Sequence, residues 1–387
     1  MTRYRSTLAA AFAMAACFGG MPAYAEDVVT IGVISATTGP MAAPGSYQIN
    51  GFKLAEEDIN KAGGVKIGDK TYKVALKIYD SRCNVAEGAA IMERLASVDK
   101  VPVALGELCT PVAAAEAPIA QDYKVPLILT VPTADNLTTQ GNPYLFRVNA
   151  PNAAQNRMLV DFIVEKNLSP VAELTFNNDT GRGAVAGRRA ILPETIKSGY
   201  IGFYNVGEVD FSSHITNIRN SGAKAIVLGM DEEAGALAIK QIRDAGLDVQ
   251  LIGTLAMDSD RFLHRLSADH VAGMVQGSAF ALTAPGEKAR IFTQAYKARF
   301  GAETHAFAAQ SYDGLIVAIE AMKKAGTVTD GEAIRNALAS VDYKGVTGDL
   351  KFDKNNQAAP LFYVTQWCKD GTRKIALPQA LAAACSS

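Results

Sequence analysis

The sequence predicts an α/β protein with two doubly wound lobes, each a parallel sheet covered by helices on both faces. The first observation is that short β-branched runs alternate with amphipathic helical stretches along the chain. This order is typical of parallel sheets, whose strands are joined by crossover helices. The second is length: after removal of an export signal about 360 residues remain, more than one core usually supports.

The first lobe begins with a strand predicted over residues 28–34 and a helix over 47–61. In that helix Phe52 and Ile59 share one face, and Gly63 ends it. The alternation continues with strands predicted at 74–78, 101–105 and 125–129 and helices at 85–98 and 111–122.

The alternation restarts near residues 149–152, which predicts the second lobe. Its first helix, over 153–166, turns Leu159, Phe162 and Ile163 inward. Strands are predicted at 171–176, 200–206, 225–230, 250–253 and 271–281, helices at 287–300, 309–324 and 329–340, and final strands at 350–352 and 361–367. No Gly/Ser-rich or Pro-rich linker separates the halves, so we expect adjacent lobes with a cleft between them.

The N-terminus predicts export to the periplasm. Arg3 and Arg5 precede an apolar stretch over residues 8–18, and a small-x-small motif ends at Ala25, where we expect cleavage. The stretch is shorter than the roughly 20 residues that span a bilayer. An alternative is a lipoprotein anchored at Cys17, but the residues before it fit that motif less well.

Four further cysteines predict two disulfides, because their number is even and the expected compartment is oxidising. They are Cys83, Cys109, Cys368 and Cys385. Three connectivities are possible, and Cys83–Cys109 with Cys368–Cys385 closes the shortest loops. Four buried free thiols are the alternative. None has the CxxC spacing of a zinc or redox site.

Composition and motifs argue against several function classes. The net charge is −1 and no basic run occurs, which argues against nucleic acid and anionic membranes as partners. We also expect no metal, since the four histidines lack ligand spacing. They are His214, His264, His270 and His305.

Catalytic and cofactor motifs are equally weak. The sequence has no GxSxG, HExxH or Walker A motif, so we expect no enzyme. Residues 181–187 imitate a dinucleotide fingerprint, but their spacing is loose and they lie in the second lobe, so no cofactor is predicted. The acidic run 231–233 precedes a helix and favours an interaction with the helix dipole.

Ligands of open parallel sheets bind beyond the carboxyl ends of the strands. The corresponding loops are residues 37–47, 81–84, 107–111, 130–135, 177–183, 230–233 and 254–258. Several of these loops begin helices, whose free N–H groups favour a carboxylate. Thr110, before Pro111, is predicted as an N-cap and candidate donor, and Thr133 is a second donor. For each threonine the alternative is a plain cap without a ligand.

A set of segments, taken in this order, carries a resemblance to a known family. They are residues 31–40, 50–64, 79–83, 106–110, 133–138, 178–183, 240–247 and 312–314. The whole mature chain resembles the leucine/isoleucine/valine-binding type of periplasmic solute receptor. The resemblance implies the type I periplasmic binding protein fold, with two lobes joined by three crossovers. It also implies hinge closure, handover to an ABC permease, and the Cys83–Cys109 bridge.

The resemblance also suggests the domain limits. Residues 1–25 are the signal peptide, residues 26–150 with 283–357 form the first lobe, and residues 151–282 with 358–387 form the second. We expect a monomer without cofactor, whose partners are a small organic carboxylate and the permease subunits.

The ligand contacts that the resemblance implies lie in both lobes. They are Tyr47, Thr110, Pro132, Thr133, Thr180, Asp231, Leu255, Ala256 and Phe307. Two departures from the family matter. Where the family has an acidic residue that holds an α-ammonium group, this sequence has Leu255 or a close neighbour. Where the family has an aromatic residue in the first lobe, this sequence has Pro44, with Tyr47 one turn away.

An unpaired buried ammonium group costs several kcal/mol, enough to abolish micromolar capture. We therefore expect an aromatic acid such as a benzoate derivative, with Tyr47, Tyr204 or Phe307 lining the pocket. Asp231 could restore an ammonium partner, which keeps amino acids as the alternative. Two rival classes are a sensor that signals to a membrane kinase and an exported enzyme on the same architecture.

Overall fold

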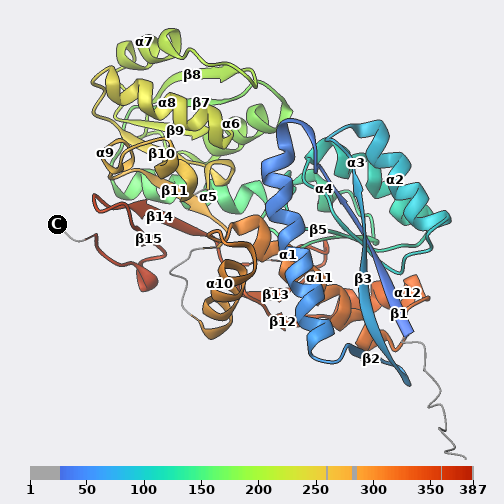
Figure 1. Cartoon of the computed structure of the whole chain (residues 1–387). Helices are drawn as coiled ribbons and strands as arrows, with labels where there is room; N and C mark the ends of the chain where they lie inside the picture. The colour runs from blue at the N-terminus through green and yellow to red at the C-terminus, as the bar shows by residue number, and fades with distance from the viewer. Residues whose placement is uncertain (1–26, 259, 281–285, 359, 386–387) are drawn as a thin grey trace, which may run out of the picture.

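The computed structural model describes residues 27–258, 260–280, 286–358 and 360–385, which form two lobes (Figure 1). The predicted signal peptide, Cys17 and the cleavage site at Ala25 lie outside the described residues. Among the helices that are described, none is long and apolar enough to cross a membrane.

The first lobe is built on a sheet of strand order β2-β3-β1-β4-β5-β6. The strands are β1 (Asp27–Ser35), β2 (Val65–Ile67), β3 (Lys70–Asp80), β4 (Ala104–Gly106), β5 (Leu127–Leu129) and β6 (Leu145–Arg147). All pairings are parallel except that of the edge strand β2 with β3. Strand β1 buries Ile31 and Val33 in one core cluster and Ile34 in another. Burial on both faces explains its nearly continuous apolar sequence.

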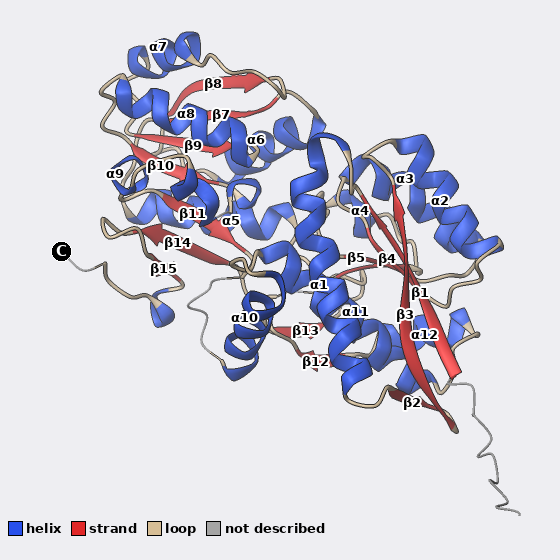
Figure 2. Ribbon diagram, in the orientation of Figure 1, coloured by secondary structure: helices blue, strands red, loops and turns tan. Residues whose placement is uncertain are grey.

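Helices cover both faces of this sheet (Figure 2). The helices of this lobe are α1 (Ala42–Lys61), α2 (Val85–Ser97), α3 (Thr110–Asp122), α4 (Asn136–Thr139), α10 (Glu287–Phe300), α11 (Ala306–Ala325) and α12 (Gly331–Leu338). Of these, α10 packs against α1. Helices α1 and α11 pack closely because Gly51 has no side chain: a Cβ there would lie 2.1 Å from the Ala308 carbonyl oxygen. A small hairpin, β12 (Asp342–Lys344) and β13 (Asp349–Lys351), follows α12.

The second lobe has the strand order β15-β14-β11-β10-β9-β7-β8. Its strands are β7 (Val171–Phe176), β8 (Ser198–Tyr204), β9 (Ala225–Gly229), β10 (Gln250–Gly253), β11 (Val275–Ser278), β14 (Tyr363–Trp367) and β15 (Arg373–Leu377). Its helices are α5 (Asn152–Glu165), α6 (Asp179–Ile191), α7 (Ser212–Asn220), α8 (Glu232–Asp244) and α9 (Ala268–Val271).

The parallel part of this sheet is confirmed, but its edge differs from the prediction. Strands β14 and β15 are antiparallel additions, and β15 was not predicted. The strand predicted over 271–281 is shorter, because α9 ends at Val271 and Gly273, with φ +77, turns the chain into β11. The disulfide between Cys368 and Cys385 ties the segment after β15 back to the end of β14.

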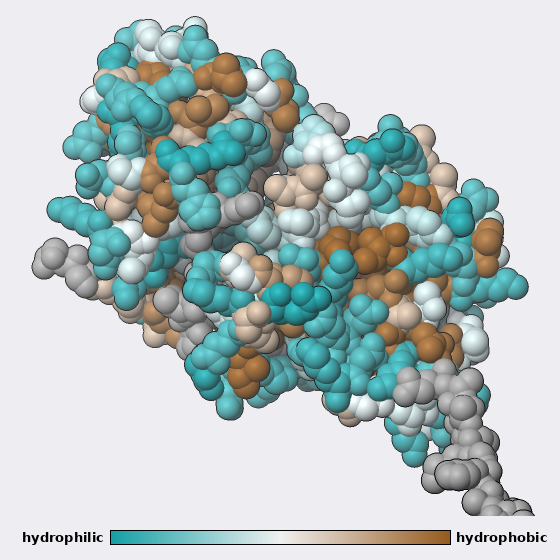
Figure 3. Space-filling model, in the orientation of Figure 1, coloured by the Kyte–Doolittle hydropathy of each residue, from teal (hydrophilic) through white to brown (hydrophobic). Residues whose placement is uncertain are grey.

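Three crossovers join the lobes, leading from β6 to α5, from β11 to α10 and from β13 to β14. Strand β6 is parallel to β5 and leads into the second lobe, so the carboxyl ends of β1, β4 and β5 lie on the side of the crossovers. The same argument applies to β11 and its parallel neighbours. The loops after both sets of strands therefore face the junction, where the surface is indented (Figure 3). The residue limits of each lobe stay a prediction.

Candidate functional site

The first-lobe face of the site is an apolar floor formed where three parallel strands end. Ala36 follows β1, Leu108 follows β4 and Val131 follows β5, and these buried residues form one cluster. Phe307 from α11 and the sulfur-bearing Cys109 pack against it. The floor thus brings together segments that lie far apart in the sequence.

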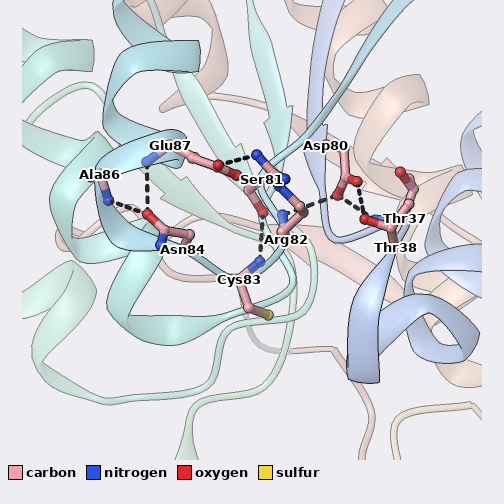
Figure 4. Close-up of polar contacts among 9 residues, drawn as sticks. All are labelled: Thr37, Thr38, Asp80, Ser81, Arg82, Cys83, Asn84, Ala86 and Glu87. Atoms are coloured by element: carbon pink, nitrogen blue, oxygen red, sulfur yellow. Dashed lines mark hydrogen bonds and ion pairs between the residues drawn. The ribbon is translucent and has the colours of Figure 1, made fainter.

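A disulfide borders this floor. Cys83 is bonded to Cys109 with a Cα–Cα distance of 5.6 Å, which confirms the predicted pairing. Cys83 lies in a tight loop in which Arg82 and Cys83 have φ values of 51° and 55°. The Asp80 carboxylate holds this loop by accepting hydrogen bonds from the N–H groups of Thr37 and Arg82, at 2.9 and 3.0 Å, and from the Thr38 hydroxyl (Figure 4).

The electrostatics of this rim favour ionised Asp80. Burial alone would raise the pKa of Asp80, but the hydrogen bonds from Thr38, Thr37 and Arg82 lower it overall. Beyond the loop, the Asn84 side chain caps α2 by accepting from the Ala86 and Glu87 N–H groups at 3.0 and 3.1 Å. The loop is thus fixed at both ends by hydrogen bonds within the lobe.

Thr110 does not cap its helix, contrary to the prediction. Cys109 is the N-cap residue, with extended backbone (φ −105, ψ 120), and Thr110 and Pro111 are the first helical residues. The physical reason is that the bonded Cys109 already supplies the extended residue that an N-cap requires. Thr110 is half-buried in the first turn of α3, next to Cys109, which packs against the floor. On the next loop, Pro132 is buried and Thr133 is half-buried.

Glu107 is a buried residue of this face that the sequence analysis missed. Its Oε1 accepts hydrogen bonds from the Leu108 and Cys109 N–H groups, at 2.8 and 3.0 Å. Burial raises its pKa, although these hydrogen bonds counteract the shift. Two N–H groups just before α3 are thus occupied by the protein's own carboxyl group. Only the position of Glu107, directly after a strand, could have signalled this.

An aromatic group stands beside the floor. The rings of Tyr47 and His305 stack at a centroid distance of 4.4 Å with an interplanar angle of 3°, and His305 meets the Phe307 ring at 4.5 Å. Tyr47 is only 8% exposed. Helix α1 reaches this position because Gly45 lies against β1, where a Cβ would be 1.8 Å from the Ala36 carbonyl oxygen.

His305 also has a capping role that the sequence did not indicate. It is the N-cap of α11, and its Nδ1 accepts a hydrogen bond from the Phe307 N–H group at 3.1 Å. An accepting Nδ1 carries no proton, so the cap fixes the tautomer as well as the orientation of the ring. No sequence pattern indicated its stacking on Tyr47, because residues 47 and 305 meet only through tertiary packing.

In the second lobe Asp231 is held by a network of hydrogen bonds. It is the N-cap of α8 and its Oδ1 accepts from the Ala234 N–H group at 2.9 Å, as its position before a helix predicts. The Tyr204 hydroxyl donates to Oδ2 at 2.9 Å and accepts from the Asp231 N–H group at 3.0 Å. Burial of Tyr204 raises its pKa, so the phenol stays protonated and remains a donor. Tyr204 is fully buried, and it contributes to this hydrogen-bond network only through its hydroxyl group.

The remaining predicted residues of the second lobe have different environments. Thr180 is half-buried in the first turn of α6, after the N-cap Asn178. Leu255 is buried in a 3-10 turn after β10, within a cluster that includes Ala150 and Phe280 from the crossovers. Ala256, its neighbour, is exposed. Leu255 is therefore an apolar contact at the junction, and Ala256 presents a small side chain to the surface.

An acidic residue does lie close to this turn, but it has partners. Asp258 is buried, and its Oδ1 accepts from the Arg373 guanidinium at 2.7 Å. The Gln276 side chain donates to the same oxygen at 3.2 Å. Charge beside Leu255 is thus neutralised within the second lobe.

Two remaining motifs have structural explanations. Gly181 is required for packing, because a Cβ there would lie 2.2 Å from the Phe176 carbonyl oxygen. Potential ligand atoms of Cys83, Glu107 and Cys109 lie within 4.8 Å of one another, but the two sulfur atoms are bonded to each other. The roles of the individual residues predicted as ligand contacts stay predictions.

Comparison with known proteins agrees with this architecture. The model of the periplasmic binding protein family matches residues 28–372. A leucine-, isoleucine-, valine-, threonine- and alanine-binding protein of Pseudomonas aeruginosa is 28% identical over 96% of this chain and 98% of its own length.

Two solved structures are also similar. The branched-chain amino acid transporter substrate-binding protein of Streptococcus pneumoniae, in complex with isoleucine, has 26% identity and a TM-score of 0.82, covering 90% of this chain and 99% of its own. A solute-binding protein of an ABC transporter from Rhodopseudomonas palustris, in complex with 3,4-dihydroxybenzoic acid, has 25% identity and a TM-score of 0.79, covering 88% and 93%. The chain belongs to the periplasmic binding protein family, as a solute-binding protein of an ABC transporter.

Proposed function

We propose that the protein binds a small aromatic carboxylate, such as a benzoate derivative, between its lobes and delivers it to an ABC importer. The observation that carries this proposal is the aromatic group of Tyr47, His305 and Phe307 beside the Thr110 turn. Aromatic rings prefer offset or edge-on contacts with other rings, and a hydroxyl at the start of a helix suits a carboxylate. One face of the site thus offers partners for both ends of such a ligand.

The second support is the state of the acidic groups. Leu255 is apolar and buried at the position where the family resemblance places an acid, and Asp258 is paired with Arg373 at 2.7 Å. A ligand with an ammonium group would therefore need another partner. A ligand without an amine brings no ammonium group into the site, and so avoids the penalty of several kcal/mol for burying that group unpaired.

Binding would begin on the first lobe, with the carboxylate at Thr110 and Thr133 and the ring beside Phe307. Closure would then bring Thr180, Asp231 and the turn at Leu255 onto the far side of the ligand. The ligand stabilises the closed form only through these additional contacts. The importer would recognise the closed form, which distinguishes loaded from empty protein.

Branched-chain or other amino acids are the second candidate. The specific observation in their favour is Asp231, whose two carboxylate oxygens accept one bond each from Ala234 and Tyr204. A carboxylate has about four acceptor positions, so Asp231 could still bind an ammonium group. The amino acids named for the similar proteins of Pseudomonas and Streptococcus also favour this candidate.

A thermal-shift comparison of ligand-free mature protein would separate the candidates. Benzoates, phenylpropenoates, fatty acids and the twenty amino acids would each be added at a large excess. A ligand at 100 times its Kd stabilises the native state by about 2.7 kcal/mol, a clear rise in Tm. We expect the rise with aromatic acids and none with leucine or valine. A rise with leucine alone would refute the aromatic-acid proposal, and turnover of a ligand would favour the exported enzyme.

A further inference from the structure

Helix α5, the first helix of the second lobe, lacks a capping side chain of its own. Its N-cap residue is Pro151, which makes no side-chain cap bond. The first amides of a helix still need acceptors. The Asn152 N–H group donates to the Thr133 carbonyl oxygen at 2.8 Å, and the Ala153 N–H group donates to Asp135 Oδ1 at 3.0 Å. Helix α5 is therefore capped by the loop that carries Thr133.

This loop belongs to the opposite lobe. It follows β5, and its first residue, Thr130, is bonded through its N–H group to the Gly106 carbonyl oxygen of β4 at 2.9 Å. Helix α5 instead packs against α6, β11 and β14 of the second lobe. Asp135 itself precedes α4 and stands at its N-cap, yet it makes no side-chain cap bond there. Its carboxylate is used to cap a helix across the hinge.

A buried arginine ties the same loop to the crossovers. Arg147, at the end of β6, is 1% exposed, and its Nη1 donates to the Ala134 carbonyl oxygen at 2.6 Å. Its Nε donates to Gln357 Oε1 at 2.5 Å, and the Gln357 amide donates to the Asn149 carbonyl oxygen at 2.7 Å. Asn149 and Gln357 lie in the first and third crossovers. The loop is thus held between the first-lobe sheet, two crossovers and α5.

We propose that Asp135 and the Thr133 carbonyl couple the loop 130–135 to the angle between the lobes. Rotation of the second lobe moves the N-terminus of α5 relative to this loop, so the two cap bonds favour the described lobe arrangement. Asp135 is a positioning residue: it acts on the loop and on α5 without touching the ligand. The inference that the loop 130–135 also binds the ligand rests on the proposed function. The coupling itself rests only on the hydrogen bonds.

The test measures the lobe angle directly, without a ligand. Spin labels would be attached at cysteines introduced for Gln121, on α3, and Asn220, on α7, which are exposed and lie in different lobes. Pulsed electron paramagnetic resonance then gives the interlobe distance distribution. We expect Asp135→Ala to broaden and shift this distribution, and Asp135→Asn, which keeps the acceptor oxygen, to restore most of it.

Asp330→Ala is the matched control. Asp330 caps α12 within the first lobe, accepting from the Glu332 and Ala333 N–H groups at 3.1 and 2.9 Å. Its loss should lower Tm without changing the interlobe distance. An Asp135→Ala distribution identical to that of the parent protein would overturn the coupling. An equal change of the distance distribution in Asp330→Ala would also overturn it, because the loss of any helix cap would then be enough to alter the interlobe distance.

Benzoate and leucine titrations of the same variants separate this proposal from the proposed function. If either probe binds the parent protein, we expect Asp135→Ala to change its Kd about fivefold, the equivalent of one cap of about 1 kcal/mol. Unchanged Kd together with a changed distance distribution would overturn the link to ligand binding. If neither probe binds, the proposed ligands are wrong, and the distance measurement still decides the coupling.

Discussion

The two faces of the candidate site use their polar groups in different ways. On the first lobe, the buried Glu107 accepts from the N–H groups of Leu108 and Cys109, and Tyr47 stacks on His305 beside the floor. On the second lobe, Asp231 stays half-buried at the start of α8, supported by Tyr204. The proposed function uses the first face for a ring and a carboxylate, whereas the alternative candidate uses Asp231 of the second face for an amine. The class of ligand therefore depends on which of the two faces contributes more to the free energy of binding.

The two disulfides give the largest test of this difference. They close loops with sequence separations of 26 and 17, so loss of either should destabilise the protein by about 3 kcal/mol in the loop-entropy picture. We expect Cys83→Ser with Cys109→Ser to abolish ligand binding as well, because this bridge borders the floor. Urea unfolding and a ligand titration of each double variant would measure both effects.

Cys368→Ser with Cys385→Ser is the matched control, since that bridge lies at the outer hairpin of the second lobe. It should lose stability and keep the ligand Kd within about threefold, below 1 kcal/mol. Equal losses of affinity in both double variants would show that general stability, and not the floor, governs binding.

A second comparison measures how substitutions at Thr110 and at Asp231 change the ligand Kd. A hydrogen bond to a charged group is worth about 1.5–3 kcal/mol, so Thr110→Val should raise the Kd for an aromatic acid about tenfold or more. Asp231→Asn keeps an acceptor for the N–H group of Ala234 and should change that Kd less than threefold, because the proposed ligand has no amine. Isothermal titration of both variants gives the values. If Asp231→Asn raised the Kd more than Thr110→Val did, the result would place an amine at Asp231 and favour amino acids as ligands.

The sequence was informative where a residue's role follows from local pattern. The continuous apolar run of β1 and the periodic face of α1 were predicted within a few residues. The three-residue strands β2 and β6 were not predicted. Strands β4 and β5 are equally short but were predicted, because they lie in longer apolar runs. Strand β15 was missed because its pairing with β14 depends on a turn and a disulfide outside the local pattern.

The site could be predicted only in part, for the same reason. Its loops follow from strand order alone, since parallel strands end at one edge. The stacking of His305 on Tyr47, the inward turn of Glu107 and the burial of Leu255 depend on contacts between distant segments. Thr110 was misplaced by one residue because a Thr-Pro pair resembles a cap, whereas Cys109 takes that position.

A third test concerns a buried acid behind the first-lobe floor. Glu116 on α3 is fully buried, and burial, together with the nearby charge of Glu107, raises its pKa well above the usual range. The native state therefore holds a proton that the unfolded state releases, so the stabilisation is present below pH ~4.3 and is lost as the pH rises through the raised pKa. Asp313, whose pKa burial raises to about 6 despite hydrogen bonds from Thr347 and Val346, contributes with the same sign.

We expect Glu116→Gln to reduce this pH dependence and to stabilise the protein at pH 7.5 by about 1 kcal/mol, since an amide has no charge to desolvate. Thermal unfolding at pH 5 and 7.5 measures the effect. Glu194→Gln is the control, because Glu194 is exposed. A parallel pH response of Glu116→Gln and the parent protein would assign the dependence to other groups.

The smallest effect is expected at the rim of the first lobe, where Arg82 and Glu87 form an ion pair (Figure 4). Exposed pairs contribute less than about 1 kcal/mol because water and salt screen them. Glu87→Gln should therefore lower Tm slightly, with the difference disappearing at high salt, and should leave ligand affinity unchanged. The Asp80 bonds to Thr37, Thr38 and Arg82 hold the loop without this pair. If Glu87→Gln instead weakened binding tenfold, the rim charges would take part in capture, and the contrast between an aromatic first lobe and an acidic second lobe would no longer explain ligand choice.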